Sequence, residues 1–411
     1  MKKVFYILIF LAVITGCKKP FNPVVTSTET GYLVVEGLIN SGSDSTFITL
    51  SHTVKLSGKT STSPEVGATV TVESDQNTSY PLTGTGKGVY ASAGLNLNNA
   101  HKYRLDIKTS SGKQYLSDFV EVVNSPPIDS VNYDTNGSPS AGPGLNVYAN
   151  THDASNKARY FRWDYQETWI FHSAFLSAYK SNGDTVLARD LVNDNINVCW
   201  RSDTSSTILL GSSAKLAQNV IINNPIISIN STSEKLGFEY SILVRQYALT
   251  GDAFDFYTNL KKNTEQLGSI FDAQPSQISG NIHAVNNPAE PVIGYISVGS
   301  TTSKRIFIFN RVLPAWVATP IYPDCVLLPD PTNPKSACCY YVFTDMYGNK
   351  ANQVDKFINY NSFTYLPGGD DPLIPIAAIT MARPPIGFTV ATKECADCTL
   401  RGTNKMPTFW K

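Results

Sequence analysis

Short β-rich runs separated by turn-forming residues constrain the fold of this chain more than any other feature. Between residues 31 and 123, apolar and β-branched runs recur at hairpin intervals, with Gly, Ser, Asn and Asp between them. This spacing is typical of an all-β sandwich. We therefore predict a mainly β fold that begins with a sandwich over residues 31–123, with strands in Tyr32–Ile39, Phe47–Leu50, Ala68–Val72, Gly88–Tyr90 and Tyr103–Ile107.

This first unit resembles the small immunoglobulin-like or transthyretin-like modules of bacterial envelope proteins. Ser125-Pro126-Pro127 follows it and predicts a linker, because consecutive prolines interrupt regular structure. Within the unit, the run Gly84-Thr85-Gly86-Lys87-Gly88 superficially suggests a phosphate-binding loop. Such a loop needs wider glycine spacing and a following helix, whereas Val89-Tyr90 indicates a strand, so a hairpin turn is the prediction.

A larger β-rich region is predicted over residues 128–411. Its strands are indicated by Leu145–Tyr148, Arg159–Tyr165 and Ser241–Tyr247. Successive residues of a strand point to opposite faces. In the second run this separates the aromatic residues Phe161, Trp163 and Tyr165, which predict a core, from Tyr160, Arg162 and Asp164.

One helix is predicted over about residues 252–267. Asp252 favours a helix N-terminus through the dipole, and Gly268 suits the end. The apolar residues at helical spacing are Phe254, Tyr257, Leu260 and Leu267. Strands are expected again at Val292–Ile296 and Arg305–Phe309, followed from about Pro314 by a cysteine-bearing tail of long loops.

The N-terminus predicts a lipid anchor at Cys17. Lys2-Lys3 precede an apolar stretch that is too short to span a bilayer, and this stretch ends at Ile14-Thr15-Gly16-Cys17. We interpret residues 1–17 as a bacterial lipoprotein signal peptide ending at the lipidated cysteine, and residues 18–30 as a tether. The competing interpretations are a non-lipidated secretory leader and a buried strand. The expected location is the outer membrane, with the periplasmic and surface faces both open.

Charge and composition exclude some classes of partner. Lys plus Arg and Asp plus Glu number 33 each, and only 16% of the 411 residues are charged. A balanced chain without a basic run gives no reason to expect nucleic acid. With 42% hydrophobic residues the chain can bury two or three cores of ordinary domain size.

Six cysteines remain after Cys17, and an even number suits disulfides in an oxidising compartment. Zinc is the weaker alternative, because Cys395-Ala396-Asp397-Cys398 offers half of a tetrahedral site without a second half. A redox role is also weak, since no strand-then-helix pattern surrounds Cys395. The sequence does not choose among the pairings of the disulfide candidates Cys199, Cys325, Cys338, Cys339, Cys395 and Cys398.

The sequence predicts no catalytic residues, metal site or cofactor. It contains no HExxH zinc motif, no GxSxG nucleophile elbow and no complete calcium loop. Asn193-Asp194-Asn195 is better explained as a turn than as calcium ligands. The histidines lack metal-ligand spacing; they are His52, His101, His152, His172 and His283.

Three tripeptides resemble the O-glycosylation motif that Bacteroidota use on exported proteins. They are Asp44-Ser45-Thr46, Asp129-Ser130-Val131 and Asp184-Thr185-Val186. The candidate acceptors are Ser45, Ser130 and Thr185. Each tripeptide would also serve as the polar edge of a strand, so both interpretations stay open.

The segment Leu260–Ile282 resembles an uncharacterised family of Bacteroidota envelope lipoproteins, domain of unknown function four-two-four-nine. The resemblance rests on Glu265, Gly268, Ile270-Phe271-Asp272, Gln274-Pro275-Ser276 and Gly280-Asn281-Ile282, with Cys199-Trp200, Val292–Tyr295 and the ending from Cys395 to Trp410. Members tend to be encoded beside TonB-dependent receptors. The resemblance implies an accessory role in uptake and no catalytic residue.

The leading hypothesis is a non-enzymatic, lipid-anchored outer-membrane protein that binds a TonB-dependent receptor or its ligand. The alternative is a module that binds a glycan or peptide ligand, with exposed aromatics as stacking platforms for glycan. The candidate platforms are Trp169, Trp316, Tyr340 and Tyr341. An unrecognised hydrolase is the third hypothesis, which a deep pocket with a perturbed carboxylate pair or histidine would favour.

Overall fold

The computed structural model describes most of the chain between residue 31 and the C-terminus. The described residues are 31–54, 63–137, 142–265, 280–318, 322, 324–328, 340, 342–344, 350–354, 374–379 and 387–411. The predicted leader and Cys17, the tether, Cys338, Cys339 and Tyr341 lie outside them. The predicted mainly β fold is confirmed, and among the described residues no helix is both long and apolar enough to cross a membrane.

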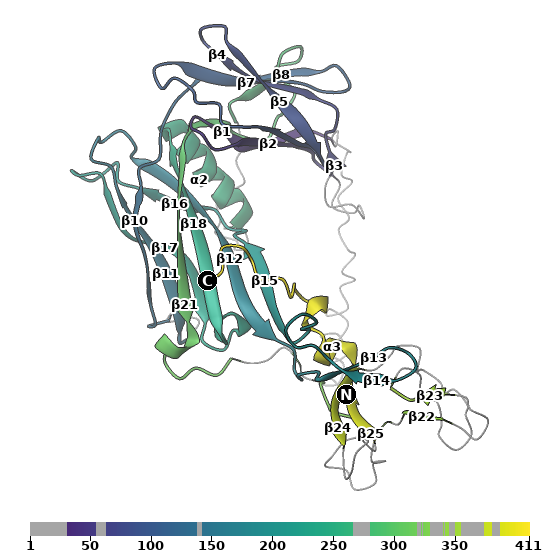
Figure 1. The fold of residues 1–411 in the computed structure, drawn as a ribbon. Coiled ribbons are helices and arrows are strands. Elements are labelled where there is room, and N and C mark those ends of the chain that lie inside the picture. Colours follow the sequence, from purple (N-terminus) through teal and green to yellow (C-terminus); the bar gives the residue numbers. More distant parts are fainter. Residues whose placement is uncertain are drawn as a thin grey trace, which may run out of the picture.

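An N-terminal module forms one end of the molecule (Figure 1). Its strands alternate buried and exposed residues, as in Lys102–Lys108, so each strand gives one face to a common core. Its strands are β1 (Leu33–Asn40), β2 (Thr46–His52), β3 (Ser63–Pro64), β4 (Thr69–Ser74), β5 (Ser79–Gly86), β6 (Val89–Ser92), β7 (Lys102–Lys108), β8 (Gln114–Ser117) and β9 (Val120–Glu121).

The predicted turn at residues 84–88 is the hairpin between β5 and β6. Lys87 and Gly88 both have positive φ, at 52° and 76°. A left-handed backbone reverses the chain directly, and glycine adopts it without steric cost. The next strand begins at Val89, where a phosphate-binding loop would require a helix.

Residues that follow helix α2 (Gly251–Glu265) in the sequence complete the N-terminal module. Strand β19 (Ile282–Ala284) pairs antiparallel with β8, and β20 (Ser297–Gly299) pairs parallel with β1. Ile282, Ile296 and Val298 belong to the same core as β1–β8. The module therefore extends beyond the predicted range 31–123. The strand expected over residues 292–296 makes only one bridge, from Ile293 to Val34, before β20 begins.

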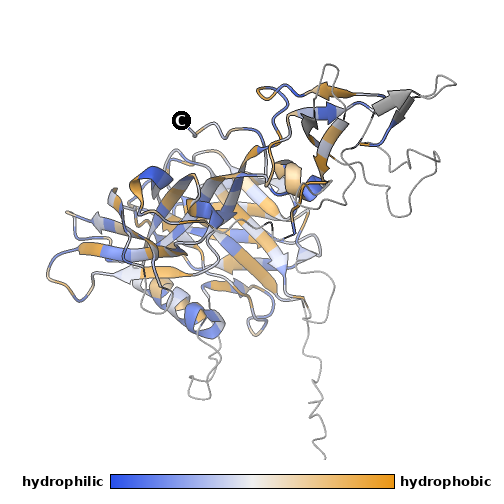
Figure 2. Cartoon of the chain, turned by 90° about the horizontal axis from the view of Figure 1, so that it is seen from below, coloured by the Kyte–Doolittle hydropathy of each residue, from blue (hydrophilic) through white to orange (hydrophobic). Residues whose placement is uncertain are grey.

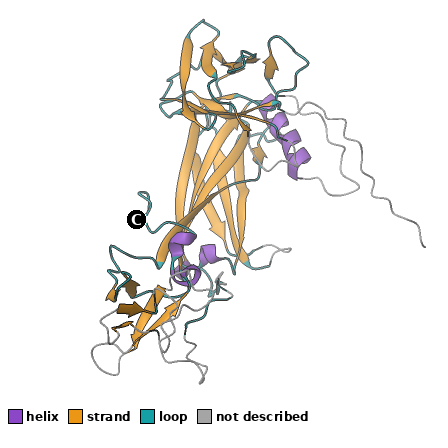
Figure 3. Ribbon diagram, turned by 90° about the vertical axis from the view of Figure 1, so that its right-hand side faces the viewer, coloured by secondary structure: helices purple, strands orange, loops and turns teal. Residues whose placement is uncertain are grey.

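Two sheets pack face to face in the central module. One contains β10 (Ile128–Asp134), β11 (Gly144–His152) and β17 (Val220–Asn230). The other has the order β15 (Val198–Thr204), β12 (Tyr160–His172), β18 (Glu239–Leu249) and β21 (Thr301–Phe309), with β16 (Leu209–Ser212) also paired to β12. Its long strands run between the N-terminal module and the opposite end of the molecule (Figure 3).

The alternation predicted for Arg159–Tyr165 is confirmed in β12. Phe161, Trp163 and Tyr165 are buried in the core between the two sheets. Arg162 and Asp164 lie on the other face and are half-buried. Colouring by hydropathy shows hydrophobic and hydrophilic residues interleaved through the sheets (Figure 2). The two faces of β12 thus have different roles, one packing the core and one carrying charge.

The buried Gln246 side chain attaches the predicted linker to this core. Its amide nitrogen donates to the Pro126 carbonyl at 2.9 Å and to Thr151 at 3.1 Å. Its amide oxygen accepts from the Trp163 indole at 3.0 Å. A buried amide is tolerated when its hydrogen bonds are made inside the protein.

The predicted helix is confirmed as α2, Gly251–Glu265, whereas its predicted end at Leu267 and Gly268 lies outside the described residues. It lies against β12 and β16, just below β1 (Figure 1). Its most buried residues are Ala253 and Phe256, whereas Phe254 packs on Tyr160 at 5.0 Å between ring centroids. The apolar side of α2 is therefore wider than the face predicted from the sequence, because the helix packs on the central sheet and also contacts Tyr295.

A small unit occupies the other end of the central module (Figure 1). Two disulfides in the described part of the chain hold this unit. They are Cys199–Cys398 and Cys325–Cys395. Its elements are β13 (Tyr179–Ser181), β14 (Val186–Ala188), β22 (Val342–Thr344), β23 (Lys350–Asn352), β24 (Ile374–Ile379), β25 (Gly387–Ala391), α3 (Lys393–Ala396) and η3 (Cys398–Leu400). The other single turns are η1 (Glu234–Leu236) and η2 (Asn310–Val312), near the central sheet.

The C-terminal tail returns from this unit onto the central sheet. Thr403 exchanges backbone hydrogen bonds with Trp200 of β15. The Trp410 ring lies 5.5 Å from Phe307, and its indole donates to Glu239 at 3.0 Å. The predicted tail of loops is therefore anchored at its end, on the face of the sheet that points away from the core.

Gly294 permits a close backbone contact between β1 and the returning segment. Its φ is +142°, and a Cβ there would lie 2.1 Å from the Val35 carbonyl oxygen. We expect Gly294→Ala to lower the free energy of unfolding by about 1–3 kcal/mol, because the clash is with backbone and the conformation is strained for alanine. Chemical denaturation measures this loss.

Gly112→Ala is the matched control for that substitution. Gly112 also has positive φ, +84°, but a Cβ there meets no atom within 4 Å. The control should therefore show only the conformational cost. Equal losses in the two variants would contradict a steric role for Gly294.

Candidate functional site

A cavity of about 590 Å³ lies where the N-terminal module, the central sheet and α2 meet. Strand β1 and residues 293–295 form one wall, and the face of β12 that carries Arg162 and Asp164 forms another. The loop at residues 204–208 and the helix close the remaining sides. Other lining residues include Glu36, Gly37, Arg245, Phe256, Tyr257, Leu260 and Tyr295.

Asp164 organises the polar wall of this cavity. Its carboxylate accepts from Arg245 Nε at 2.5 Å and from the Tyr247 hydroxyl at 2.7 Å. Burial and the Asp164 charge raise the pKa of Tyr247, so its hydroxyl stays protonated and donates. Burial opposes the charged form of Arg245, but the hydrogen bond to Asp164 and the charge of Asp164, with a contribution from Tyr247, together raise the pKa of Arg245.

Arg162 stands beside this network without a carboxylate partner among the described residues. Its guanidinium carbon lies 4.4 Å from the Tyr247 ring centroid and 4.9 Å from that of Tyr257. Its Nε is buried and makes no hydrogen bond. A second cavity of about 370 Å³ also contacts Arg162 and Gly37, together with Ser45, Phe47 and Tyr247. Arg162 therefore contacts both hollows of the junction.

This arrangement is suited to binding a polar ligand. Aromatic rings offer flat apolar surfaces and Arg162 offers directed donors, the mixture found in small-molecule sites. The one carboxylate of the polar wall, Asp164, is already engaged by Arg245 and Tyr247. No group of three metal-ligating side chains occurs in the described part of the chain.

A more apolar cleft of about 610 Å³ lies at the other end of β12. His172 stacks on Phe238 with 3.8 Å between ring centroids, and burial lowers the pKa of His172. Trp316 and Val317 also line the cleft. Because the lowered pKa favours the neutral imidazole, His172 adds aromatic surface here rather than charge.

The aromatic residues proposed as stacking platforms lie in different surroundings. Trp169 is only 4% exposed and belongs to the central core, so its proposed role as a platform is wrong. Tyr340 is half-buried against Phe388 and Val390. Trp316 lines the apolar cleft.

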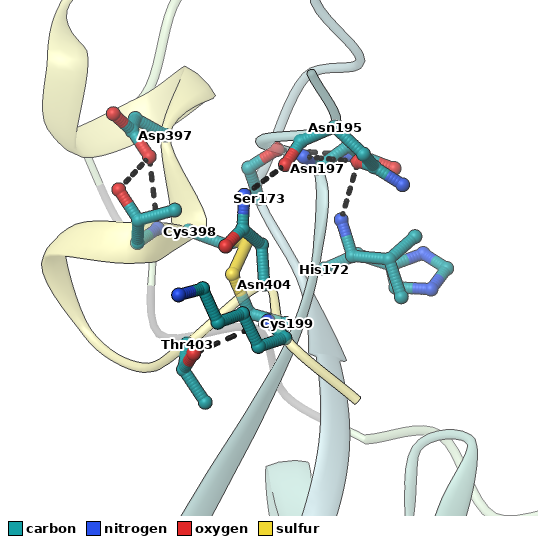
Figure 4. Close-up of a disulfide and its surroundings, with 12 residues drawn as sticks. His172, Ser173, Asn195, Asn197, Cys199, Asp397, Cys398, Thr403 and Asn404 are labelled. Atoms are coloured by element: carbon teal, nitrogen blue, oxygen red, sulfur yellow. Dashed lines mark hydrogen bonds between the residues drawn. A yellow bond between two sulfur atoms is a disulfide. The ribbon is translucent and has the colours of Figure 1, made fainter. Parts of the chain in front are cut away.

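Four of the six disulfide candidates are paired. The two cysteines of the Cys395–Cys398 motif bond to different partners, Cys325 and Cys199, rather than to each other. Figure 4 shows the second of these bonds beside Asp397, which caps the turn that begins at Cys398. This pairing removes both thiols from metal or exchange chemistry.

The remaining polar candidates have local partners. Asp194 accepts from Lys180 at 2.8 Å and from Arg189 at 3.1 Å, in agreement with a turn rather than a calcium site. Four histidines lie beside carboxylates: His52 beside the largely covered Glu65, and His101, His152 and His283 beside Asp75, Asp129 and Asp118.

The three glycosylation candidates are at the surface or partly covered. Ser45 is exposed, whereas Ser130 and Thr185 are half-buried. Ser130 accepts a hydrogen bond from Asn150 at 2.9 Å. Their modification stays a prediction.

The charged face of β12 was not predicted from the sequence as part of a site. The alternation separated Arg162 and Asp164 from the aromatic face, which was assigned to the core, and no function was assigned to the charged face. A sequence signal for this site was present on β18, the strand that pairs with β12. There, Arg245 and Tyr247 are also polar residues two positions apart. Paired strands that both carry charge on one face indicate a polar surface that another element must cover.

The comparisons with known proteins identify a family without a known function. The family described as "Domain of unknown function (DUF4249)" matches residues 18–305, and the tail from Cys395 to Trp410 lies beyond this range. No curated protein matches the chain. Among solved structures, the adhesin InvE of Yersinia pseudotuberculosis is 14% identical, with a TM-score of 0.14 over 53% of this chain. The chain spans about half of that protein, 54%, and this likeness carries no argument. Because the family match covers more than half of its length, the chain belongs to the DUF4249 family.

Proposed function

We propose that this protein is a non-enzymatic binding protein of the cell envelope. In this proposal the lipid on Cys17 holds it in the outer membrane, where it binds a TonB-dependent receptor or the ligand of that receptor during nutrient uptake. The leader that ends at Cys17 supports the anchor. Each methylene of a lipid chain that enters the bilayer contributes about 0.8 kcal/mol, so several chains anchor the protein stably.

The cavity at the junction of the modules is the observation that carries the binding function. Residues from β1, β12, β18, α2 and the 293–295 segment all line it, although they are far apart in the sequence. Its polar wall has one engaged carboxylate and one unpaired cation. A site that holds its ligand by contacts from several rigid elements needs little ordering on binding, which favours affinity.

A glycan-binding function is the second candidate. It is supported by Trp316, which lines the apolar cleft together with the exposed Val317. The burial of Trp169 counts against the same idea at the centre of the molecule. Aromatic rings bind the apolar faces of sugars, so a glycan would be expected at the cleft rather than at the Arg162 cavity.

Purification from native outer membranes tests the first proposal. The lipoprotein would be isolated in mild detergent, and the proteins that co-elute would be identified by mass spectrometry. We expect one TonB-dependent receptor in near-stoichiometric amount. A Cys17→Ala variant, which cannot be lipidated, should recover much less receptor because it is not held at the membrane.

Two outcomes of that purification would count against the proposal. Recovery of no receptor with the lipidated protein would reject the accessory role and direct attention to glycan arrays. Equal recovery with Cys17→Ala would reject the requirement for the anchor, while the receptor contact itself would stand.

A further inference from the structure

Arg162 is a half-buried cation without a carboxylate partner among the described residues. Its Nε is buried without a hydrogen bond, and no carboxylate oxygen among the described residues lies within ion-pair distance of it. Burying an unpaired charge is costly unless another group compensates it. The two tyrosine rings compensate only part of this cost, since a cation–π contact contributes about 0.5–2 kcal/mol.

The two rings also fix the position of the guanidinium. Tyr247 comes from β18 and Tyr257 from α2, so two separate elements hold the same group. Arg162 contacts the larger cavity and the smaller one. A planar donor group in a fixed position beside open space is arranged to receive a planar or tetrahedral oxyanion.

The nearby carboxylates do not occupy this position. Asp164 is engaged by Arg245 and Tyr247. Glu36 also lines the larger cavity, but it is exposed and forms no ion pair within the described residues. Ser206 and Thr207, whose side chains carry hydroxyl donors, also line the larger cavity.

We propose that the junction cavity binds the anionic group of a ligand, a carboxylate or a phosphate, and that Arg162 is its charged partner. The inference rests on the proposed binding function and adds the chemical class of the ligand. Tyr247 and Tyr257 are positioning residues, because they hold the guanidinium and leave its donors for the anion.

Calorimetry on the lipidated protein in mild detergent tests this proposal. The probes are inorganic phosphate, glucuronate and glucose at low ionic strength. Glucuronate and glucose share a ring and differ by a carboxylate, whereas phosphate separates the two anion classes. We expect at least one anion to bind and glucose not to bind. Added salt should weaken the binding.

Variants at Arg162 identify the partner of the anion. Arg162→Gln removes the charge and should weaken binding by about 10- to 100-fold, since a charge-assisted hydrogen bond is lost. Arg162→Lys keeps the charge without the planar fork and should give an intermediate loss. Arg201→Gln removes an exposed arginine from the neighbouring strand β15 and should leave binding unchanged. Thermal unfolding of each variant shows whether the fold is kept.

Three results would overturn the inference: glucose binding as tightly as glucuronate, unchanged anion binding in Arg162→Gln, or no binding of either anion to the unmodified protein. If Arg162→Gln does not fold, the Arg162→Lys variant decides: the expected intermediate loss supports the inference, and unchanged affinity overturns the assignment of the Arg162 guanidinium as the partner of the anion. These results are independent of the receptor purification. If a receptor is recovered but no anion binds, the accessory role stands and the anion site is rejected. If an anion binds but no receptor is recovered, the anion site stands and the accessory role is rejected.

Discussion

Removing the Cys199–Cys398 disulfide, by replacing both cysteines with serine, is expected to lower the free energy of unfolding by about 2–5 kcal/mol. The bond joins β15 to η3 across 199 residues, so its loss frees a very long loop in the unfolded chain. Both cysteines are almost fully buried, at 0% and 1% exposed. The tail that carries Trp410 also loses its covalent attachment to β15. Urea unfolding of the oxidised protein measures the change.

The other disulfide provides the matched control. Cys325–Cys395 closes a separation of 70 residues, and replacing both cysteines should cost about 1 kcal/mol less if loop entropy dominates. Changing both partners in each variant leaves neither cysteine of the removed bond as a free thiol. A Cys199→Ser/Cys398→Ser protein that unfolds at the same urea concentration as the unmodified protein would contradict the expected stabilisation.

Patterns carried within single segments of the sequence were sufficient to predict much of the fold. The two-residue alternation in β12 identified its core face, and the turn at Lys87 followed from the glycines around it. Helix α2 followed from the helical spacing of its apolar residues and from the acidic Asp252 in its first turn. These features depend on neighbouring residues, so physical rules of short range are enough to find them.

The return of residues 280–299 to the N-terminal module could not be predicted in the same way. Strand β19 pairs with β8 across about 165 residues, and nothing local to Ile282 or Ser117 specifies that pairing. The cavity has the same origin, because Arg162 on β12 meets Tyr257 only after α2 has packed. By contrast, the burial of Trp169 was predictable, since it continues the alternation of Phe161, Trp163 and Tyr165.

The buried Glu167 is the centre of a charged cluster inside the central core. It is 2% exposed, and its carboxylate accepts from Lys235 and, at 2.9 Å, from the Tyr240 hydroxyl. The Lys235 ammonium also lies 5.0 Å from the Trp169 ring centroid. Burial, with a further contribution from Glu167, raises the pKa of Tyr240, so this hydroxyl stays a donor. Lys235 is therefore the only cation that the described residues place on this carboxylate.

Lys235→Met is expected to lower the free energy of unfolding by about 3 kcal/mol, because it leaves Glu167 buried with one neutral partner. This loss lies at the lower end of the range expected for breaking a buried ion pair, since the Lys235 side chain is 25% exposed and water reaches it. Glu167→Gln combined with Lys235→Met removes both charges and keeps an acceptor for Tyr240, so it should recover more than half of the loss. Chemical denaturation of both single variants and the double variant gives the coupling between the two residues. If Lys235→Met lies within about 0.5 kcal/mol of the unmodified protein, the pair behaves as a surface salt bridge, and the cluster does not stabilise the core.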